Sequence, residues 1–396
     1  MQGESEDLQN QLNHVYSRKV CVGTGLFYFL TKIQMKKVFR GALCACVAGF
    51  VLASCEPANL GGDDAPVVNR PDVFILCEGV YGANNADVTA YKSDSMLCTG
   101  EYYLKQNGQY LGDTGQDILY HNGHLYVSVY GSSYVAKLDL DGKELTRYSF
   151  SAEEGQPRYL AAEGEYLYVT LYSGQVAKMR AADLSVVDYA PVRKNPEGIV
   201  VYKDQLLVAN SGWGEENTVT IIDMASFDSI ASITVEWNPQ QFVLAGDSVY
   251  LLANGQYDEF WNCSYPVQCI DVEKRTARTI TNATHAVAYG DTLYLCNSLT
   301  DWTSETYATT NTFFTYDVKS GVVGTQSFIL GDIEEVTSNS VYMMEVNPTN
   351  GDIYIGLSGN KFVSSGMVHR YDRDGGLIHR FDVQGANPNQ AAFVER

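Results

Sequence analysis

A short motif that recurs about every 40 residues constrains the fold of this chain most strongly. Its pattern is an apolar residue, Tyr or an apolar residue, an apolar residue, and then a small or apolar residue. The seven copies are V-F-I-L at 73–76, L-Y-V-S at 125–128, L-Y-V-T at 167–170, L-L-V-A at 206–209, V-Y-L-L at 249–252, L-Y-L-C at 293–296 and I-Y-I-G at 353–356. Further short apolar runs precede and follow each copy, and many of the preceding runs begin with Pro, as in P-R-Y-L-A at 157–161. Four short strands per repeat predict the blades of an all-β propeller.

The two ends of the repeat region predict how the ring closes. The first unit begins with its second strand, V-F-I-L at 73–76, and has no inner strand of its own. The chain ends with Q-A-A-F-V at 390–394, which has the pattern of an inner strand with nothing after it. We therefore expect residues 72–396 to form a seven-bladed β-propeller, closed by the C-terminal strand pairing into the N-terminal blade. The alternative is a six-bladed ring with loose ends.

The segment before the repeats has the features of an export signal. Residues 35–54 combine a basic start with a short uncharged apolar run, which is typical of a secretory signal and too short for a transmembrane helix. The run ends in Leu52-Ala53-Ser54-Cys55, which resembles the bacterial lipobox and predicts lipidation of Cys55. The alternative is a buried core segment with an incidental Cys. Residues 1–34 then represent an upstream start chosen too early, and residues 55–71, rich in Pro, Gly and Asp, a flexible tether.

Charge and cysteine content limit the partners and the cross-links. The net charge of −20 disfavours nucleic acid and anionic membrane surfaces, so any membrane attachment is expected through the lipid alone. Cys263 and Cys269 bracket five residues and are close enough in sequence to form a disulfide, which export would permit. Two free thiols are the equally weighted alternative.

The sequence contains no recognisable catalytic or metal-binding motif. G-x-S-x-G, H-E-x-x-H and paired C-x-x-C motifs are all missing. Asp139-x-Asp141-Gly142 resembles the start of a calcium loop but has no acidic twelfth residue, so we expect an ordinary hairpin turn. His285 is the one histidine expected near the mouth of the central channel. We therefore predict no enzyme, no catalytic residue, no resident metal and no cofactor.

Aromatic residues are expected to gather on one face of the disc. Loops between blades and loops from second to third strands open on the same face, and all four tryptophans fall in these loops. The loops at 211–217, 254–265 and 297–311 are also long. Long, aromatic-rich loops on one face favour a binding surface, although each Trp could instead cover its own loop base. The predicted ligand-binding residues in these loops are Tyr81, Tyr110, Tyr130, Arg158, Tyr159, Tyr172, Trp213, Trp237, Tyr257, Trp261 and Trp302.

The repeat region resembles a known family. The residues that carry the likeness are C-E-G-V-Y-G-A-N-N-A-D-V at 77–88, N-G-Q-Y-L-G-D-T-G-Q-D at 107–117, P-R-Y at 157–159, V-N-P-T-N-G-D-I-Y at 346–354 and H-R-Y-D-R-D-G at 369–375. They resemble the YncE-type seven-bladed propellers of Bacteroidetes surface lipoproteins, and within these the BtuG-type cobalamin-capturing proteins. The resemblance implies an outer-membrane, cell-surface lipoprotein that captures a corrinoid and passes it to a TonB-dependent transporter.

Two other classes of function remain open. Propeller lactonases and lyases need acids or histidines that converge on the channel, and Glu78, Asp117 and Glu197 are placed to approach it. A protein–protein scaffold is the third class, and it is compatible with capture because a captured ligand must be handed on.

Overall fold

The structure is a computed structural model that describes residues 70–256, 263–301, 305, 308–331 and 334–394. The predictions for residues 1–69, including Cys55, and for Tyr257, Trp261 and Trp302 lie outside the described residues. No helix of the described chain is long and apolar enough to cross a membrane.

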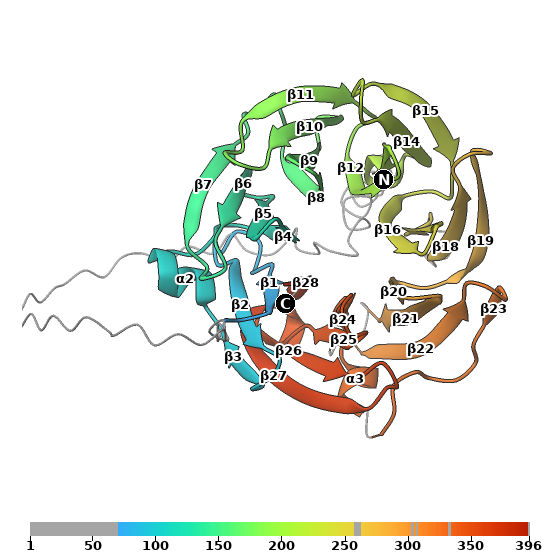
Figure 1. The fold of residues 1–396 in the computed structure, drawn as a ribbon. Coiled ribbons are helices and arrows are strands. Elements are labelled where there is room, and N and C mark those ends of the chain that lie inside the picture. The colour runs from blue at the N-terminus through green and yellow to red at the C-terminus, as the bar shows by residue number, and fades with distance from the viewer. Residues whose placement is uncertain (1–69, 257–262, 302–304, 306–307, 332–333, 395–396) are drawn as a thin grey trace, which may run out of the picture. The chain divides into compact units, whose positions relative to one another are not determined.

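Seven four-stranded antiparallel sheets form a ring, with the inner strand of each sheet facing the centre (Figure 1). The inner strands are β4 (Gly115–His121), β8 (Pro157–Glu163), β12 (Pro196–Tyr202), β16 (Pro239–Ala245), β20 (His285–Tyr289), β24 (Val341–Val346) and β28 (Pro388–Phe393). The second strands are β1 (Val73–Cys77), β5 (His124–Val129), β9 (Tyr166–Leu171), β13 (Gln205–Asn210), β17 (Ser248–Ala253), β21 (Thr292–Thr300) and β25 (Ile353–Leu357).

The outer half of each blade completes the sheet. The third strands are β2 (Asp87–Lys92), β6 (Tyr134–Leu138), β10 (Gln175–Arg180), β14 (Thr218–Asp223), β18 (Pro266–Asp271), β22 (Thr309–Asp317) and β26 (Ser365–Tyr371). The fourth strands are β3 (Leu97–Thr99), β7 (Glu144–Ser149), β11 (Val186–Pro191), β15 (Ser229–Thr234), β19 (Thr276–Asn282), β23 (Val322–Val323) and β27 (Leu377–Ala386). The all-β, seven-bladed prediction is confirmed.

The chain closes its ring as expected. β28, the last strand, pairs antiparallel with β1, with Phe74 opposite Ala392 and Ile75 opposite Ala391. The sheet order β28-β1-β2-β3 therefore joins the two ends of the domain in one blade. Closure removes the unpaired edge that an open ring would leave on β1.

The hydrophobic core consists of separate clusters, each of which lies between two adjacent blades. Seven buried apolar clusters occur in the described chain, and each draws residues from two adjacent blades. The Tyr of the repeated motif supplies much of this contact: Tyr126 is 1% exposed, and its hydroxyl donates to the Ala181 carbonyl of the next blade at 2.7 Å. A blade is therefore stable only between neighbours, as the repeat predicts.

One local prediction about the loops was wrong. Residues 297–300 and 309–311 of the predicted loop are strand, because β21 and β22 pair as far as Thr300 opposite Thr309. Short helices also interrupt connections that carried no helical periodicity: α2 (Tyr102–Asn107) between the first two blades, and α3 (Glu334–Ser338) before the last. Helices of one or two turns are too short to leave a periodic pattern.

Cys263 and Cys269 are both free thiols, so the disulfide does not form. Asp139 accepts from the Asp141 and Lys143 amides at 3.0 and 2.9 Å, which is the hairpin turn that we expected.

Candidate functional site

The channel mouth is shaped by irregular starts of the inner strands. In six of the seven blades, the pairing register of the inner strand shifts within its first few residues. A β-bulge of this kind re-aims a side chain and is common beside functional sites. We call the six polar side chains at these shifts the bulge ring: Gln116, Arg158, Glu197, Gln240, Tyr342 and Asn389.

All members of the bulge ring belong to the loop face, the face on which the inter-blade and second-to-third-strand loops open. Inner strands begin at this face because the inter-blade loops lead into them. Four members follow directly after the Pro that begins the strand. The sequence pattern predicted these prolines as strand starts, but it did not predict the ring of polar residues after them. The sequence signal that could have revealed the bulge ring is a Pro followed by a polar residue, which recurs at the start of four inner strands.

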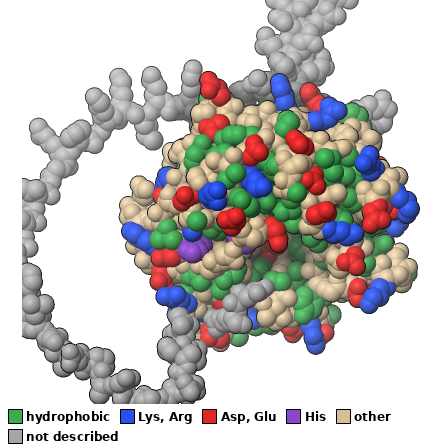
Figure 2. Space-filling view, turned by 45° about the horizontal axis from the view of Figure 1, so that its top comes forward, with side chains coloured by type: hydrophobic (Ala, Val, Ile, Leu, Met, Phe, Trp, Pro, Cys, Tyr) green, Lys and Arg blue, Asp and Glu red, His purple; other side chains and the backbone are tan. Residues whose placement is uncertain are grey.

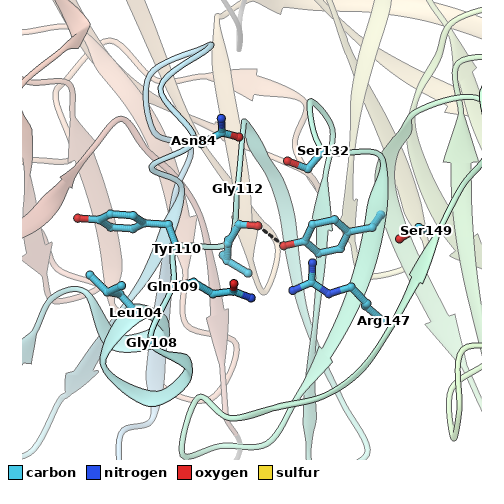
Figure 3. Close-up of a pocket in the computed structure, with 11 residues that line it drawn as sticks. Asn84, Leu104, Gly108, Gln109, Tyr110, Gly112, Ser132, Arg147 and Ser149 are labelled. Carbon is cyan, nitrogen blue, oxygen red and sulfur yellow. Dashed lines mark hydrogen bonds between the residues drawn. The ribbon is translucent and has the colours of Figure 1, made fainter. Parts of the chain in front are cut away.

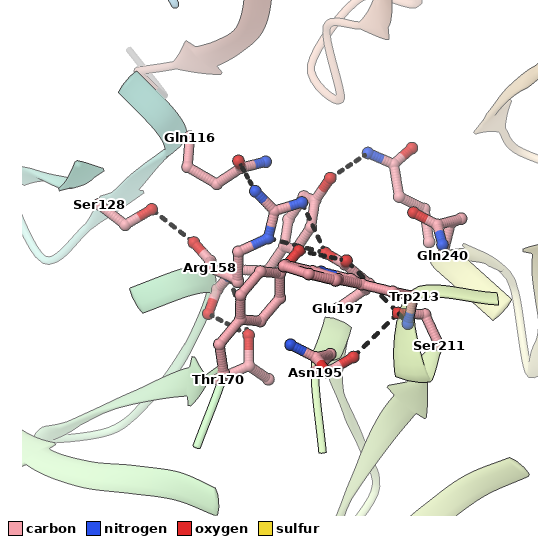
Figure 4. A network of polar contacts seen from close by, with 12 residues as sticks. Gln116, Ser128, Arg158, Thr170, Asn195, Glu197, Ser211, Trp213 and Gln240 are labelled. Carbon is pink, nitrogen blue, oxygen red and sulfur yellow. Dashed lines mark hydrogen bonds and ion pairs between the residues drawn. The ribbon is translucent and has the colours of Figure 1, made fainter. Parts of the chain in front are cut away.

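Two neighbouring members of the bulge ring, Arg158 and Glu197, form a buried ion pair. The Arg158 guanidinium donates to Oε2 of Glu197 from Nε at 2.8 Å, and its Nη2 lies 2.7 Å from the same oxygen. Arg158 Nη1 also donates to Oε1 of Gln116 (Figure 4). The side chains of Arg158 and Glu197 are 7% and 4% exposed. The pair therefore lies largely out of water, where a charge without its partner is costly.

Aromatic rings pack against this ion pair and continue from it toward solvent. The Arg158 guanidinium carbon lies 5.1 Å from the ring centroid of Tyr130 and 4.8 Å from that of Tyr172. Tyr172 contacts Tyr130 and Trp213 edge to face, with centroids 5.3 and 5.8 Å apart. Its hydroxyl donates to Oε1 of Glu197 at 2.6 Å. We call Tyr130, Tyr172 and Trp213 the aromatic cluster, which joins three neighbouring blades above the ion pair.

Trp213 is the exposed end of the aromatic cluster. It lies in the short 3₁₀ turn η1 (Gly212–Gly214) between β13 and β14, and is 53% exposed. Its φ and ψ of 58° and 41° are left-handed, which is unusual for a bulky side chain. Ser211 holds the turn by accepting from the Trp213 amide at 3.2 Å and donating to the Asn195 carbonyl at 2.9 Å. The turn thus presents an indole ring to solvent at a cost in backbone strain.

The other predicted site residues lie in several places. Arg158 and Tyr159 were predicted at an inter-blade loop, but they lie inside strand β8, which begins at Pro157 as the sequence predicted; Pro157 pairs with Leu171. Tyr159 is buried in the core. Tyr81, Tyr110 and Trp237 lie in loops of the loop face and are 41%, 38% and 37% exposed.

Three carboxyl groups near the channel have unusual acidity. Burial raises the pKa of Glu78 to about 7, that of Asp117 to about 6 and that of Glu345 to about 8. The hydroxyl of Tyr342 donates to Oε2 of Glu78 at 2.5 Å, which partly offsets the effect of burial there. Burial also lowers the pKa of His285 to about 4, so this histidine is neutral near pH 7.

These pKa values predict that stability falls as pH rises. A buried carboxyl with a raised pKa keeps its proton in the folded state while the unfolded chain loses it, so unfolding becomes easier between about pH 4.5 and 8. We expect Glu345→Gln to reduce this fall in the free energy of unfolding by up to about 1.4 kcal/mol per pH unit. Urea unfolding at pH 5, 6, 7 and 8 measures it. The exposed Glu163→Gln is the control, and equal slopes in both variants would contradict the prediction.

The channel itself has little free space. A cavity of about 40 Å³ is lined by Tyr159, His285, Tyr342, Glu345 and Asn389, among others. That volume suits a water molecule or two. Nε2 of Gln116 and Oδ1 of Asn389 are buried without a hydrogen-bond partner within the described part of the chain. No group of three or more His, Cys, Asp or Glu residues in that part could hold a metal ion.

The fold and the site together define a seven-bladed β-propeller with a polar channel mouth and an exposed aromatic residue beside it. A family model described as "Domain of unknown function (DUF5074)" matches residues 72–393, and the chain belongs to this family. A search of curated proteins finds no match.

Two solved structures share the architecture. Hydrazine synthase of Kuenenia stuttgartiensis is similar with a TM-score of 0.55 and 18% identity, covering 67% of this chain and 86% of that one. A quinoprotein alcohol dehydrogenase-like protein of Bacteroides thetaiotaomicron VPI-5482 is similar with a TM-score of 0.58 and 17% identity, covering 82% and 78%. At these identities the likeness shows the fold alone.

Proposed function

We propose that the protein is an exported binding protein that captures a large amphipathic ligand on its loop face, with a corrinoid such as cobalamin as the first choice. The observation that carries the proposal is the aromatic cluster, in which Trp213 is exposed above a buried ion pair. Aromatic side chains supply large contact areas, and fixed polar groups beside them orient a ligand.

The strained backbone of Trp213 supports this role. A bulky residue with left-handed φ and ψ costs about 1–3 kcal/mol. The strain here holds an indole ring in water, where it contributes little to folding. A ligand that covers the ring would recover apolar burial at about 25 cal/mol per Å².

The small channel cavity determines where a large ligand would bind. At about 40 Å³ the cavity is too small for a macrocycle, so the ligand would lie across the channel mouth against Trp213. Arg158, predicted to contact the ligand, is engaged with Glu197 and Gln116. We assign it instead the role of holding the Tyr130 and Tyr172 rings in place.

The corrinoid itself is proposed from the sequence resemblance carried by residues 77–88 and 107–117. The same resemblance supports a surface location and transfer of the ligand to an outer-membrane TonB-dependent transporter. The net charge of −20 is consistent with a protein that attaches to the membrane through a lipid and not through its surface.

Lipidation of Cys55 is part of the proposal. We expect Cys55→Ala to lose all incorporation of labelled fatty acid and to leave the membrane fraction, because the thiol is the acyl acceptor. Metabolic labelling followed by fractionation measures both. Normal labelling of the variant would disprove the assignment of Cys55.

Truncation of Trp213 tests the binding face. We expect Trp213→Ala to weaken cyanocobalamin binding about 30-fold, because truncating a central aromatic anchor typically costs about 2 kcal/mol. Tyr202→Ala is the control: it removes an aromatic ring at the opposite end of the blade, where the Tyr202 hydroxyl donates to the Asp247 carbonyl at 3.1 Å. Equal affinities of the two variants would contradict the assignment of the aromatic cluster.

The raised pKa values of Glu78 and Glu345 favour a second function, an enzyme that uses a protonated carboxyl group as a general acid. Mass spectrometry of the ligand after prolonged incubation separates the two functions. Capture predicts an unchanged ligand, whereas a product that no longer forms with Glu78→Gln would establish the enzyme.

A further inference from the structure

A second open groove lies between the first two blades. It has a volume of about 590 Å³, within the range of about 300–1,000 Å³ that is usual for ligand sites. Figure 3 shows Asn84 and Ser132 toward one end of the groove and Gln109 and Arg147 toward the other. These residues come from the β1–β2 loop, the β5–β6 loop, the α2–β4 connection and β7.

The groove is electrically neutral. Arg147 is its one charged lining residue, and Glu144 accepts from Nε and Nη2 of Arg147 at 2.7 and 2.6 Å. Nη2 also donates to the Tyr103 hydroxyl at 3.2 Å. The guanidinium carbon of Arg147 is thereby held over the Tyr134 ring, 4.1 Å from its centroid. The salt bridge compensates the charge and leaves the Nη1 donors of Arg147 unused among the described residues.

The remaining lining groups are amides and hydroxyls that can both donate and accept. The side chains of Asn84, Gln109 and Ser149 are exposed and have no hydrogen-bond partner within the described chain. Ser132 Oγ accepts from the Asp113 amide at 2.9 Å, which leaves its proton free to donate. Tyr110 adds a partly exposed ring. Paired donors and acceptors beside an aromatic ring match the hydroxyls and C–H faces of a sugar.

The wall of the groove is fixed before any ligand arrives. The Ala86 amide donates to the Gly112 carbonyl at 2.9 Å, and the Leu111 amide donates to the Ala86 carbonyl at 3.0 Å. Gly112 has a φ of 132°, and a Cβ there would lie 2.4 Å from Ser132 Oγ, so only glycine allows this close contact. A preformed site loses little entropy on binding.

We propose that this groove is a second binding site, for a neutral oligosaccharide. Its lack of net charge disfavours phosphate, uronate and other anionic ligands, and its polar lining disfavours apolar ones. The groove shares no lining residue with the aromatic cluster, although Ser132 and Tyr130 lie in the same β5–β6 loop. The proposal does not depend on corrinoid capture.

Calorimetry with neutral hexasaccharides tests the proposal on residues 70–396, which contain the complete ring of blades and all seven clusters. The probes are maltohexaose, cellohexaose, xylohexaose, mannohexaose and chitohexaose, with hexagalacturonate as the anionic comparison. We expect saturable binding of at least one neutral probe, at least tenfold weaker in the Asn84→Gly/Gln109→Ala double variant. Glycine suits position 84 because the φ of Asn84 is 53°.

The control variant is Gln326→Ala, which truncates an exposed glutamine in the connection between the sixth and seventh blades. It should bind as the unchanged protein does, and saturating cyanocobalamin should not compete with the sugar. The proposal would be overturned if no neutral probe binds at about 10 mM, which is well above a dissociation constant of about 1 mM. It would also be overturned if the double variant binds the sugar as tightly as the control variant, or if hexagalacturonate is the one probe that binds.

Discussion

Truncation after Ala386 is expected to destroy the folded state, because it removes β28, the inner strand of the first blade. The cut would leave β1 without its partner and expose the sheet edge that ring closure covers. It would also remove Asn387 and Asn389, whose buried amides donate to the Gly79 carbonyl at 3.0 Å and the Gln116 carbonyl at 2.8 Å. We expect a loss of at least about 5 kcal/mol, comparable to the whole stability of many domains.

Solubility and thermal unfolding measure this result. Truncation after Val394 is the matched control, since it keeps β28 and the hydrogen bond from the Val394 amide to the Asp72 carbonyl at 2.9 Å. The control should melt like the full domain. A soluble domain that lacks β28 and melts at the same temperature would be incompatible with closure through the C-terminal strand.

Arg158→Met is expected to cost about 3–5 kcal/mol, because it leaves the Glu197 carboxylate buried without its cation. Glu197 is 3% exposed and would keep the hydrogen bond from the Tyr172 hydroxyl at 2.6 Å. The same change would remove the guanidinium against which the Tyr130 and Tyr172 rings pack. Urea unfolding measures the loss, and we expect the fluorescence of Trp213 to change as the aromatic cluster loosens.

The double variant Arg158→Met/Glu197→Leu is the control for the buried charge. Replacing a buried ion pair by apolar groups of similar size is often nearly neutral, so we expect it to recover much of the lost stability. A double variant as unstable as the sum of its two single variants would show that Arg158 and Glu197 act independently, against the geometry described above.

The fold could be predicted from the sequence because its periodicity is local. Each copy of the motif buries its second residue between blades, a Tyr in five of the seven copies, as at Tyr126 and Tyr168, so seven copies reveal seven blades. The unpaired motif at 390–394 likewise revealed the closing strand. The helices α2 and α3 and the long β21–β22 hairpin were missed because they depend on contacts in the folded ring and not on a repeating pattern.

The site was predictable only in part. Loop positions correctly placed Trp213 and Trp237 on one face, since blade topology fixes the direction of each loop. The sequence could not show that Arg158 and Glu197 form a buried ion pair, because 39 residues separate the two. The bulges that bring them together arise from strand pairing, and only the recurring Pro-polar pair pointed to them.

Titration calorimetry of residues 70–396 with cyanocobalamin tests the central claim most directly, with tryptophan fluorescence recorded in parallel. Capture on the loop face predicts saturable one-to-one binding, with quenching that Trp213→Ala diminishes. The absence of both heat and quenching at about 100 μM ligand, far above the dissociation constant of about 1 μM that corresponds to −8.2 kcal/mol, would contradict corrinoid capture.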